Sequence, residues 1–170
     1  MGVARWRHDE SPFGQGKKSG PNPTDRAKGG VKRSLLTEAN GIPVALAIDG
    51  ANRHDMKMVL ATLKDLARWS QAWQGRQSGL CMDKGYDYDE VRQLVARYGF
   101  VAHIRERGEE AVKIKHEGFR ARRWVVERAH SWINRFRGLL IRRYKKAENY
   151  LGLLHFACGL IALRATRLLG

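Results

Sequence analysis

Apolar and polar positions follow regular patterns after the first 30 residues of the chain. Two extended segments, residues 31–39 and 43–50, flank Asn40 and Gly41. Because both residues of an Asn-Gly pair accept positive φ, this pair between extended segments is typical of a β-hairpin. Apolar residues then recur at the spacing of one helix face, at Met56, Val59, Leu60, Leu63, Leu66 and Ala67. The pattern predicts a helix that Asp55 can cap.

The second half of the chain alternates short apolar segments with helical patterns. Residues 79–83 and 100–104 predict two buried strands, and residues 87–98 predict a helix between them. Two further helices are expected at about residues 119–136 and 146–168. Strands that alternate with helices favour parallel pairing. The expected fold class is therefore α/β, with a mixed sheet flanked by helices.

Residues 1–30 differ from the rest of the chain. They contain three of its four prolines and lack a periodic apolar pattern. The segment from Gly20 to Asp25 is rich in residues that favour turns. We therefore expect an irregular, Gly/Pro-rich segment at residues 1–30 and a folded domain at residues 31–170.

Length, charge and cysteine content narrow the possible functions. A chain of 170 residues is expected to form one domain. Its net charge of +15 fits a phosphate-rich partner, nucleic acid before an anionic membrane, and argues against polycationic partners. Cys81 and Cys158 are too few for a disulfide framework or a zinc ribbon. The first eight residues contain no apolar segment, so we expect no signal peptide, and the longest uncharged stretch, residues 150–163, is short for a membrane span.

Basic residues cluster late in the chain, where aromatic residues are interleaved with them. The cluster consists of Arg120, Arg122, Arg123, Arg128, Arg135, Arg137, Arg142, Arg143, Lys145 and Lys146. Such a run can be a solvated helix face. However, Glu127 is the only acid between Arg120 and Ala147, and this one-sided charge favours phosphate binding. The cluster therefore predicts a DNA-binding surface.

Two acids are candidates for catalysis. Asp83 ends a predicted buried strand, and sites in α/β sheets gather at the carboxyl ends of strands; the alternative is an ordinary turn or cap aspartate. Glu127 lies on a predicted helix with Arg123 one turn before it, so from the pattern alone a solvated, arginine-paired glutamate is the better interpretation. His54, Asp55 and His103 have no partners at metal-ligand spacing.

Six segments, taken in order, resemble a bacterial insertion-sequence transposase of the DDE type from about Gly20 to the C-terminus. Each is weak alone, but six in the same order are specific. They are Gly20-Pro21-Asn22-Pro23-Thr24-Asp25-Arg26, Lys32-Arg33-Ser34-Leu35-Leu36, Gly50-Ala51-Asn52-Arg53-His54-Asp55, Asp83-Lys84-Gly85-Tyr86-Asp87, Arg123-Trp124-Val125-Val126-Glu127-Arg128 and Asn149-Tyr150-Leu151.

The resemblance implies an RNase H-like core in which carboxylates bind two Mg²⁺ or Mn²⁺ ions for phosphodiester cleavage and strand transfer. Asp83 matches the second family aspartate and Glu127 the family glutamate. The family also has a Tyr-Arg-Glu-Lys pattern. Here Arg123 matches its arginine, whereas Arg120 and Asn134 replace its tyrosine and lysine, with Arg135 beside the latter.

The chain departs from the family at its N-terminus. By spacing, the first family aspartate should fall near Arg5 or Trp6, and neither is acidic. Asp9 is an unlikely substitute for the first family aspartate, because we expect it to lie beyond any strand that residues 3–7 could form. The family pattern therefore implies the C-terminal part of a transposase, which lacks part or all of its first central strand. We expect it to cleave DNA poorly, because each missing carboxylate weakens the binding of a hard cation.

The resemblance also implies partners and a location. The expected partner is double-stranded DNA, both the terminal repeats of the element and its target, and the complete protein is expected to be a homo-oligomer. No membrane partner is expected, and the location is the cytoplasm, at the bacterial nucleoid. The main alternative is a catalytically dead remnant that only binds DNA. A stand-alone RNase H-like nuclease is a further alternative.

Overall fold

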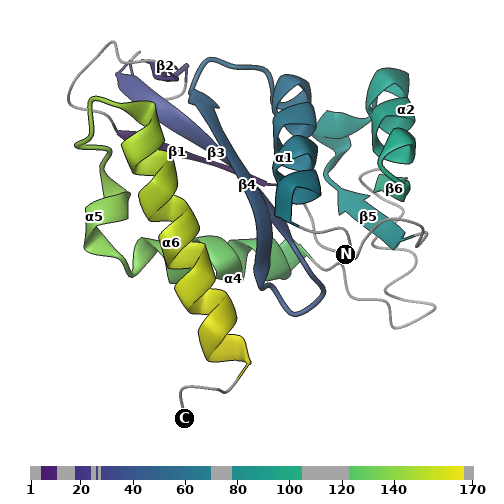
Figure 1. The fold of residues 1–170 in the computed structure, drawn as a ribbon. Helices are drawn as coiled ribbons and strands as arrows, with labels where there is room; N and C mark the ends of the chain where they lie inside the picture. The colour runs from purple at the N-terminus through teal and green to yellow at the C-terminus, as the bar shows by residue number, and fades with distance from the viewer. Residues whose placement is uncertain are drawn as a thin grey trace.

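The computed structural model describes residues 5–10, 18–23, 26, 28–69, 78–104 and 123–166, with only the backbone described at residues 5–10, Trp69 and Arg123. These parts form a mixed α/β structure with two sheets, shown in Figure 1. The expected α/β fold class, with sheets and helices, is therefore confirmed.

The predicted hairpin is present in the larger sheet, where β3, Gly29–Thr37, is the central strand. This strand pairs antiparallel with β4, Pro43–Gly50. The chain reverses through Gly41, whose φ is +86°. This value lies in the left-handed region that glycine adopts at little cost, which is why the Asn-Gly signal located the turn correctly.

Two further strands lie in the segment that we expected to be irregular. Strand β1, Arg5–Glu10, pairs antiparallel with β3 along its whole length, and β2, Gly20–Pro21, pairs with the start of β3. The expectation that Asp9 lies beyond any strand is therefore wrong, because Asp9 is paired with Val31 inside β1. Residues 5–10 have no apolar alternation of their own; the partner strand supplies the backbone hydrogen bonds that define this one.

The second sheet follows the sequence prediction closely. Strand β5, Ser78–Met82, pairs in parallel with β6, Phe100–Ile104. Between them lie the short 3₁₀ helix η2, Lys84–Tyr86, and helix α2, Asp89–Arg97. Parallel strands need a crossover connection, and α2 provides it.

Helix α1, Asp55–Trp69, covers one face of the hairpin, and the last three helices cover the other (Figure 1). These are α4, Arg123–Asn134, α5, Arg137–Leu140, and α6, Ala147–Ala165. The helix expected at residues 119–136 is described from Arg123 and ends at Asn134, and a second short helix follows it. No helix in the described part of the chain is long and apolar enough to cross a membrane.

Alternate residues of β3 contact the two helical layers. The Ser34 hydroxyl lies 2.5 Å from the hydroxyl of Thr62 on α1. On the opposite face, the Arg33 guanidinium donates to the carbonyl of Leu139 on α5 at 2.7 Å. Because successive side chains of a strand point to opposite faces, β3 lies between two hydrophobic cores, one with α1 and β5–β6 and one with α4–α6.

Candidate functional site

Asp83 lies directly after β5, at the strand end where the sequence places it. Its side chain is half-buried and accepts a hydrogen bond from the Lys84 amide at 3.0 Å, which caps η2. The turn-cap interpretation is therefore correct as a description of its local structure. A cap and a metal ligand are compatible roles, since a carboxylate has more than one lone pair to offer.

Aromatic and acidic side chains surround this strand end. Tyr86 is buried, and burial, followed by the negative charges of Asp55 and Asp83, raises the pKa of its phenol well above the ordinary value. The rings of His54 and Tyr88 meet edge to face with their centroids 6.0 Å apart. The start of α1 and the segment around η2 therefore lie beside each other.

A buried lysine fixes the start of α1. The Lys32 ammonium lies 2.5 Å from Asp55 Oδ1 and donates to the Arg53 carbonyl at 2.8 Å. Asp55, which was expected to cap the helix, is the first residue of α1, and its carboxylate pairs with this lysine. Lys32 lies in one of the six family-like segments, but the sequence pattern did not predict this structural role. A charged residue in the middle of an apolar strand was the signal that could have found it.

Glu127 lies on α4 and is exposed. Its neighbour Arg128 packs between two indole rings, 4.6 Å from the centre of the Trp124 ring and 4.9 Å from that of Trp132. Arg128 also donates to the Asn40 carbonyl in the hairpin turn. Its guanidinium therefore joins α4 to the β3–β4 turn, a structural role that the charge pattern alone did not reveal.

The described residues do not form a complete metal centre. Within them, no three side chains of His, Cys, Asp or Glu lie close enough together to hold a metal ion. The side chain of Asp9 lies outside the described part, although its backbone belongs to β1. Asp83 and Glu127 supply the oxygen donors that a hard cation prefers, but two carboxylates do not make a two-metal centre.

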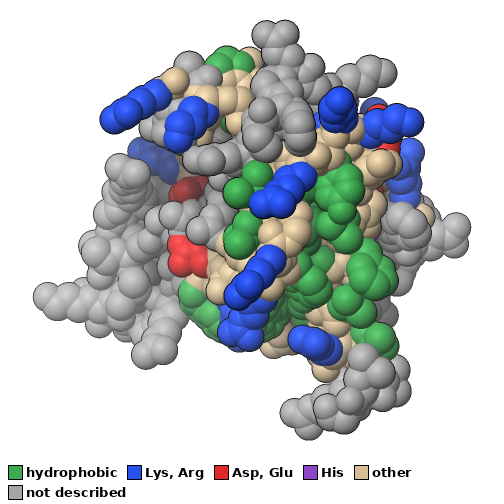
Figure 2. All heavy atoms as spheres, turned by 90° about the vertical axis from the view of Figure 1, so that its left-hand side faces the viewer, with side chains coloured by type: hydrophobic (Ala, Val, Ile, Leu, Met, Phe, Trp, Pro, Cys, Tyr) green, Lys and Arg blue, Asp and Glu red, His purple; other side chains and the backbone are tan. Residues whose placement is uncertain are grey.

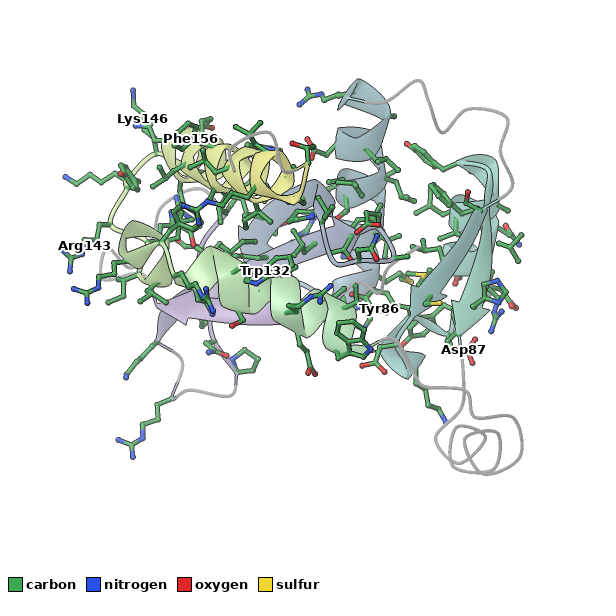
Figure 3. The ribbon with its side chains drawn as sticks, turned by 90° about the horizontal axis from the view of Figure 1, so that it is seen from below. Tyr86, Asp87, Trp132, Arg143, Lys146 and Phe156 are labelled. Carbon is green, nitrogen blue, oxygen red and sulfur yellow. The ribbon has the colours of Figure 1, made fainter. Side chains whose placement is uncertain are left out.

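The predicted basic cluster separates into exposed and buried members. Arg135, Arg137, Arg143, Lys145 and Lys146 are exposed. Figure 2 shows Lys and Arg side chains around a hydrophobic area on the side of the molecule that carries α5, and Figure 3 places Arg143 and Lys146 at the opposite end of the view from Tyr86 and Asp87. The side chains of Arg120, Arg122 and Arg123 lie outside the described part.

Arg142 has a different environment from the rest of the cluster. It is 1 % exposed and donates to the carbonyls of Lys18, Tyr144 and Lys145 at 3.1–3.2 Å. Burial lowers the pKa of its guanidinium, which nevertheless stays charged at neutral pH. The N–H groups of the Arg142 guanidinium therefore face the protein interior and not the surface.

Asn134 occupies the lysine position of the Tyr-Arg-Glu-Lys pattern, and Arg135 follows it. Asn134 is half-buried, and its side-chain oxygen lies 3.4 Å from the Arg33 guanidinium, so it faces the protein. The adjacent Arg135 is exposed. Of these two residues, Arg135 is the more exposed one.

Comparison with known proteins identifies one family. A family model described as "Transposase DDE domain" matches residues 5–161. The chain is also 35% identical over 159 residues to a protein of Burkholderia cepacia assigned as a transposase for insertion sequence element IS402, a match that covers 88% of this chain and 71% of that protein. The family match includes β1, both candidate acids and most of α6.

Proposed function

Because the chain belongs to the DDE transposase family, we propose that it acts in transposition by binding the DNA ends of its element. The observation that carries the proposal is the group of exposed cations on and beside α5: Arg135, Arg137, Arg143, Lys145 and Lys146. Phosphate neutralisation releases counterions, and this release supplies much of the affinity of a protein for DNA. With a net charge of +15, long-range attraction acts in the same direction.

Asp83 and Glu127 are the proposed catalytic carboxylates. Asp83 lies at a strand end, where its carbonyl accepts a hydrogen bond from the amide of buried Tyr86 at 3.0 Å, and Glu127 lies exposed on α4. Asp83 and Glu127 would hold a divalent cation, which would supply activation of the attacking oxygen and stabilisation of the leaving one. Asp9, inside β1, is the acid nearest to the expected position of the first family aspartate, and if it does not complete the site we expect this chain alone to cleave DNA slowly.

The test combines binding and cleavage on one preparation of the full chain. DNA binding is measured by fluorescence anisotropy over a range of salt concentrations, and nicking of a supercoiled plasmid is measured with Mg²⁺, with Mn²⁺ and with EDTA. We expect salt-sensitive binding under all three conditions. Any nicking should need the cation and disappear in Asp83→Asn and Glu127→Gln, whose DNA affinity should not fall.

A second candidate function is DNA binding without catalysis. The exposed cations on and beside α5 support DNA binding with or without a metal centre. In that case binding is salt-sensitive and indifferent to the cation, and no nicking occurs. Nicking that persists in both carboxylate variants would contradict the catalytic assignment. Absence of salt-dependent binding would contradict both functions.

A further inference from the structure

A groove lies between the end of α4 and the end of α6. Its volume is about 470 Å³, which is in the range of pockets that bind small organic ligands. The residues that line it are Trp132, Arg135, Phe136, Leu160, Ile161, Arg164 and Ala165. None of them is among the proposed catalytic residues, and only Arg135 belongs to the basic cluster.

The groove combines an apolar floor with a basic rim. Ile161 is buried in the core beneath it, and Trp132, Phe136 and Leu160 are half-buried. Arg135, which directly follows α4, and Arg164, in the last turn of α6, are exposed at the rim. A ligand that satisfies both parts needs a flat or apolar portion to cover the floor and a negative charge to reach the two guanidinium groups.

The indole at the floor is held in position before any ligand binds. The guanidinium of Arg128 packs against the Trp132 ring at 4.9 Å, and Arg128 is itself joined to the β3–β4 turn. Figure 3 shows Trp132 on α4, and the ring belongs to the edge of the core that includes Ile133 and Ile161. A preorganised aromatic surface loses little conformational entropy on binding.

We propose that this groove binds an unpaired nucleotide of DNA, with its base against Trp132 and Phe136 and its phosphate between Arg135 and Arg164. A nucleotide supplies both the aromatic face and the negative charge that the groove requires. A base inside a duplex is stacked and paired, so only a single-stranded end or a locally opened strand presents one. This inference rests on the proposed function, since it assumes that DNA is the partner.

The experiment compares three fluorescent DNAs that share one duplex sequence. The first is blunt, the second has a short single-stranded thymidine extension, and the third has an abasic extension with the same number of phosphates. The thymidine extension should bind at least about fivefold more tightly than the abasic one, because base–aromatic stacking contributes about this much per base. The abasic extension reports the effect of the added phosphates alone.

Two matched variants locate the effect. Ala165→Glu places a carboxylate at the groove, and Ala67→Glu makes the same change at an exposed position of α1 on another part of the surface. Both variants change the net charge equally. Only Ala165→Glu should remove the preference for the thymidine extension over the abasic one, while both should reduce affinity for the blunt duplex by a similar small factor.

The outcomes separate this inference from the proposed function. Equal binding of the thymidine and abasic extensions, with normal duplex binding, overturns the inference and leaves the proposed function standing. If Ala67→Glu also loses the preference for the thymidine extension over the abasic one, the assignment of this preference to the groove is wrong. If Ala165→Glu changes the sedimentation coefficient and keeps the preference, a second copy of the chain occupies the groove, and the inference is wrong. No binding to any of the DNAs overturns both proposals.

Discussion

Arginine side chains have two distinct roles in this molecule, and adjacent residues can differ completely. Arg142 is buried and donates to three backbone carbonyls, whereas Arg143 is exposed. Arg33 and Arg128 also donate to carbonyls within the fold. A charged donor in such a position satisfies carbonyls that burial would otherwise leave without hydrogen bonds. Charge alone is therefore a poor guide to which arginines meet DNA.

Replacing Arg142 should affect stability more than replacing its neighbour. We expect Arg142→Gln to lower the free energy of unfolding by about 2–3 kcal/mol, because a charged hydrogen-bond donor is lost inside the protein. Arg143→Gln should change it by about 0.5 kcal/mol or less, as is usual at exposed positions. Urea denaturation of the two variants provides the measurement. Equal midpoints would contradict the assignment of Arg142 to the interior.

The thiol of Cys158 should make stability depend on pH in the alkaline range. Burial raises its pKa from 9.0 to about 12. Because the folded pKa is the higher one, the stabilisation is fully present below about pH 9 and is lost as pH rises toward 12. The slope is about 1.4 kcal/mol per pH unit.

The control for this pH dependence is Cys158→Ala, which removes the titrating group. The variant starts less stable because a buried side chain is truncated, but between pH 9 and 11 it should lose less stability than the original chain. The free energy of unfolding is measured by urea denaturation at each pH. Parallel pH profiles for the two proteins would show that the thiol does not contribute.

At the scale of the elements, the β3–β4 turn is fixed by contacts as well as by its own sequence. A side chain added at Gly41 would place its Cβ 3.0 Å from the Val125 carbonyl and 3.3 Å from the Arg128 guanidinium. Gly99, which follows α2, has a similar φ of +80° but has no atom within 4 Å of that position. The two glycines therefore share a backbone requirement and differ in their surroundings.

Substituting each glycine with alanine separates these two effects. Gly99→Ala should cost about 1 kcal/mol of stability, which is the cost of a positive φ for a residue with a Cβ. Gly41→Ala should cost more, about 2–3 kcal/mol, because α4 must also move away from the turn. Thermal and urea denaturation measure both changes. Similar losses for the two variants would mean that the turn does not pack tightly against α4.

At the scale of the whole molecule, charge is distributed unevenly. The proposed DNA surface around α5 carries exposed cations, whereas near the strand end at Asp83 the acids Asp55 and Asp87 form ion pairs with Lys32 and Arg92. Figure 3 shows Arg143 and Lys146 far from Asp87 in the same view. Such a separation orients an approaching polyanion, which meets the basic end first.

Removal of one exposed cation should change the salt dependence of DNA binding according to its position. Arg143→Gln should reduce the slope of log affinity against log salt by about 1, because one phosphate contact is lost. Lys57→Gln, an equal change of charge at an exposed position of α1, should leave the slope nearly unchanged. Anisotropy titrations over a range of salt give both slopes. Identical slopes in the two variants would mean that DNA does not contact the region around α5 specifically.

The sequence by itself determined the elements whose signals are local. The hairpin, β5, β6 and the helix between them follow from the spacing of apolar residues and from glycines at turns, because periodicity and φ preference depend on near neighbours in the chain. It also determined the net charge and the family. Only the tertiary structure decided that residues 5–10 form a strand, that Lys32 pairs with Asp55 and that Arg142 is buried. The physical reason is that each of these features depends on a partner distant in sequence, and a local pattern contains no information about which distant backbone or charge will lie next to it.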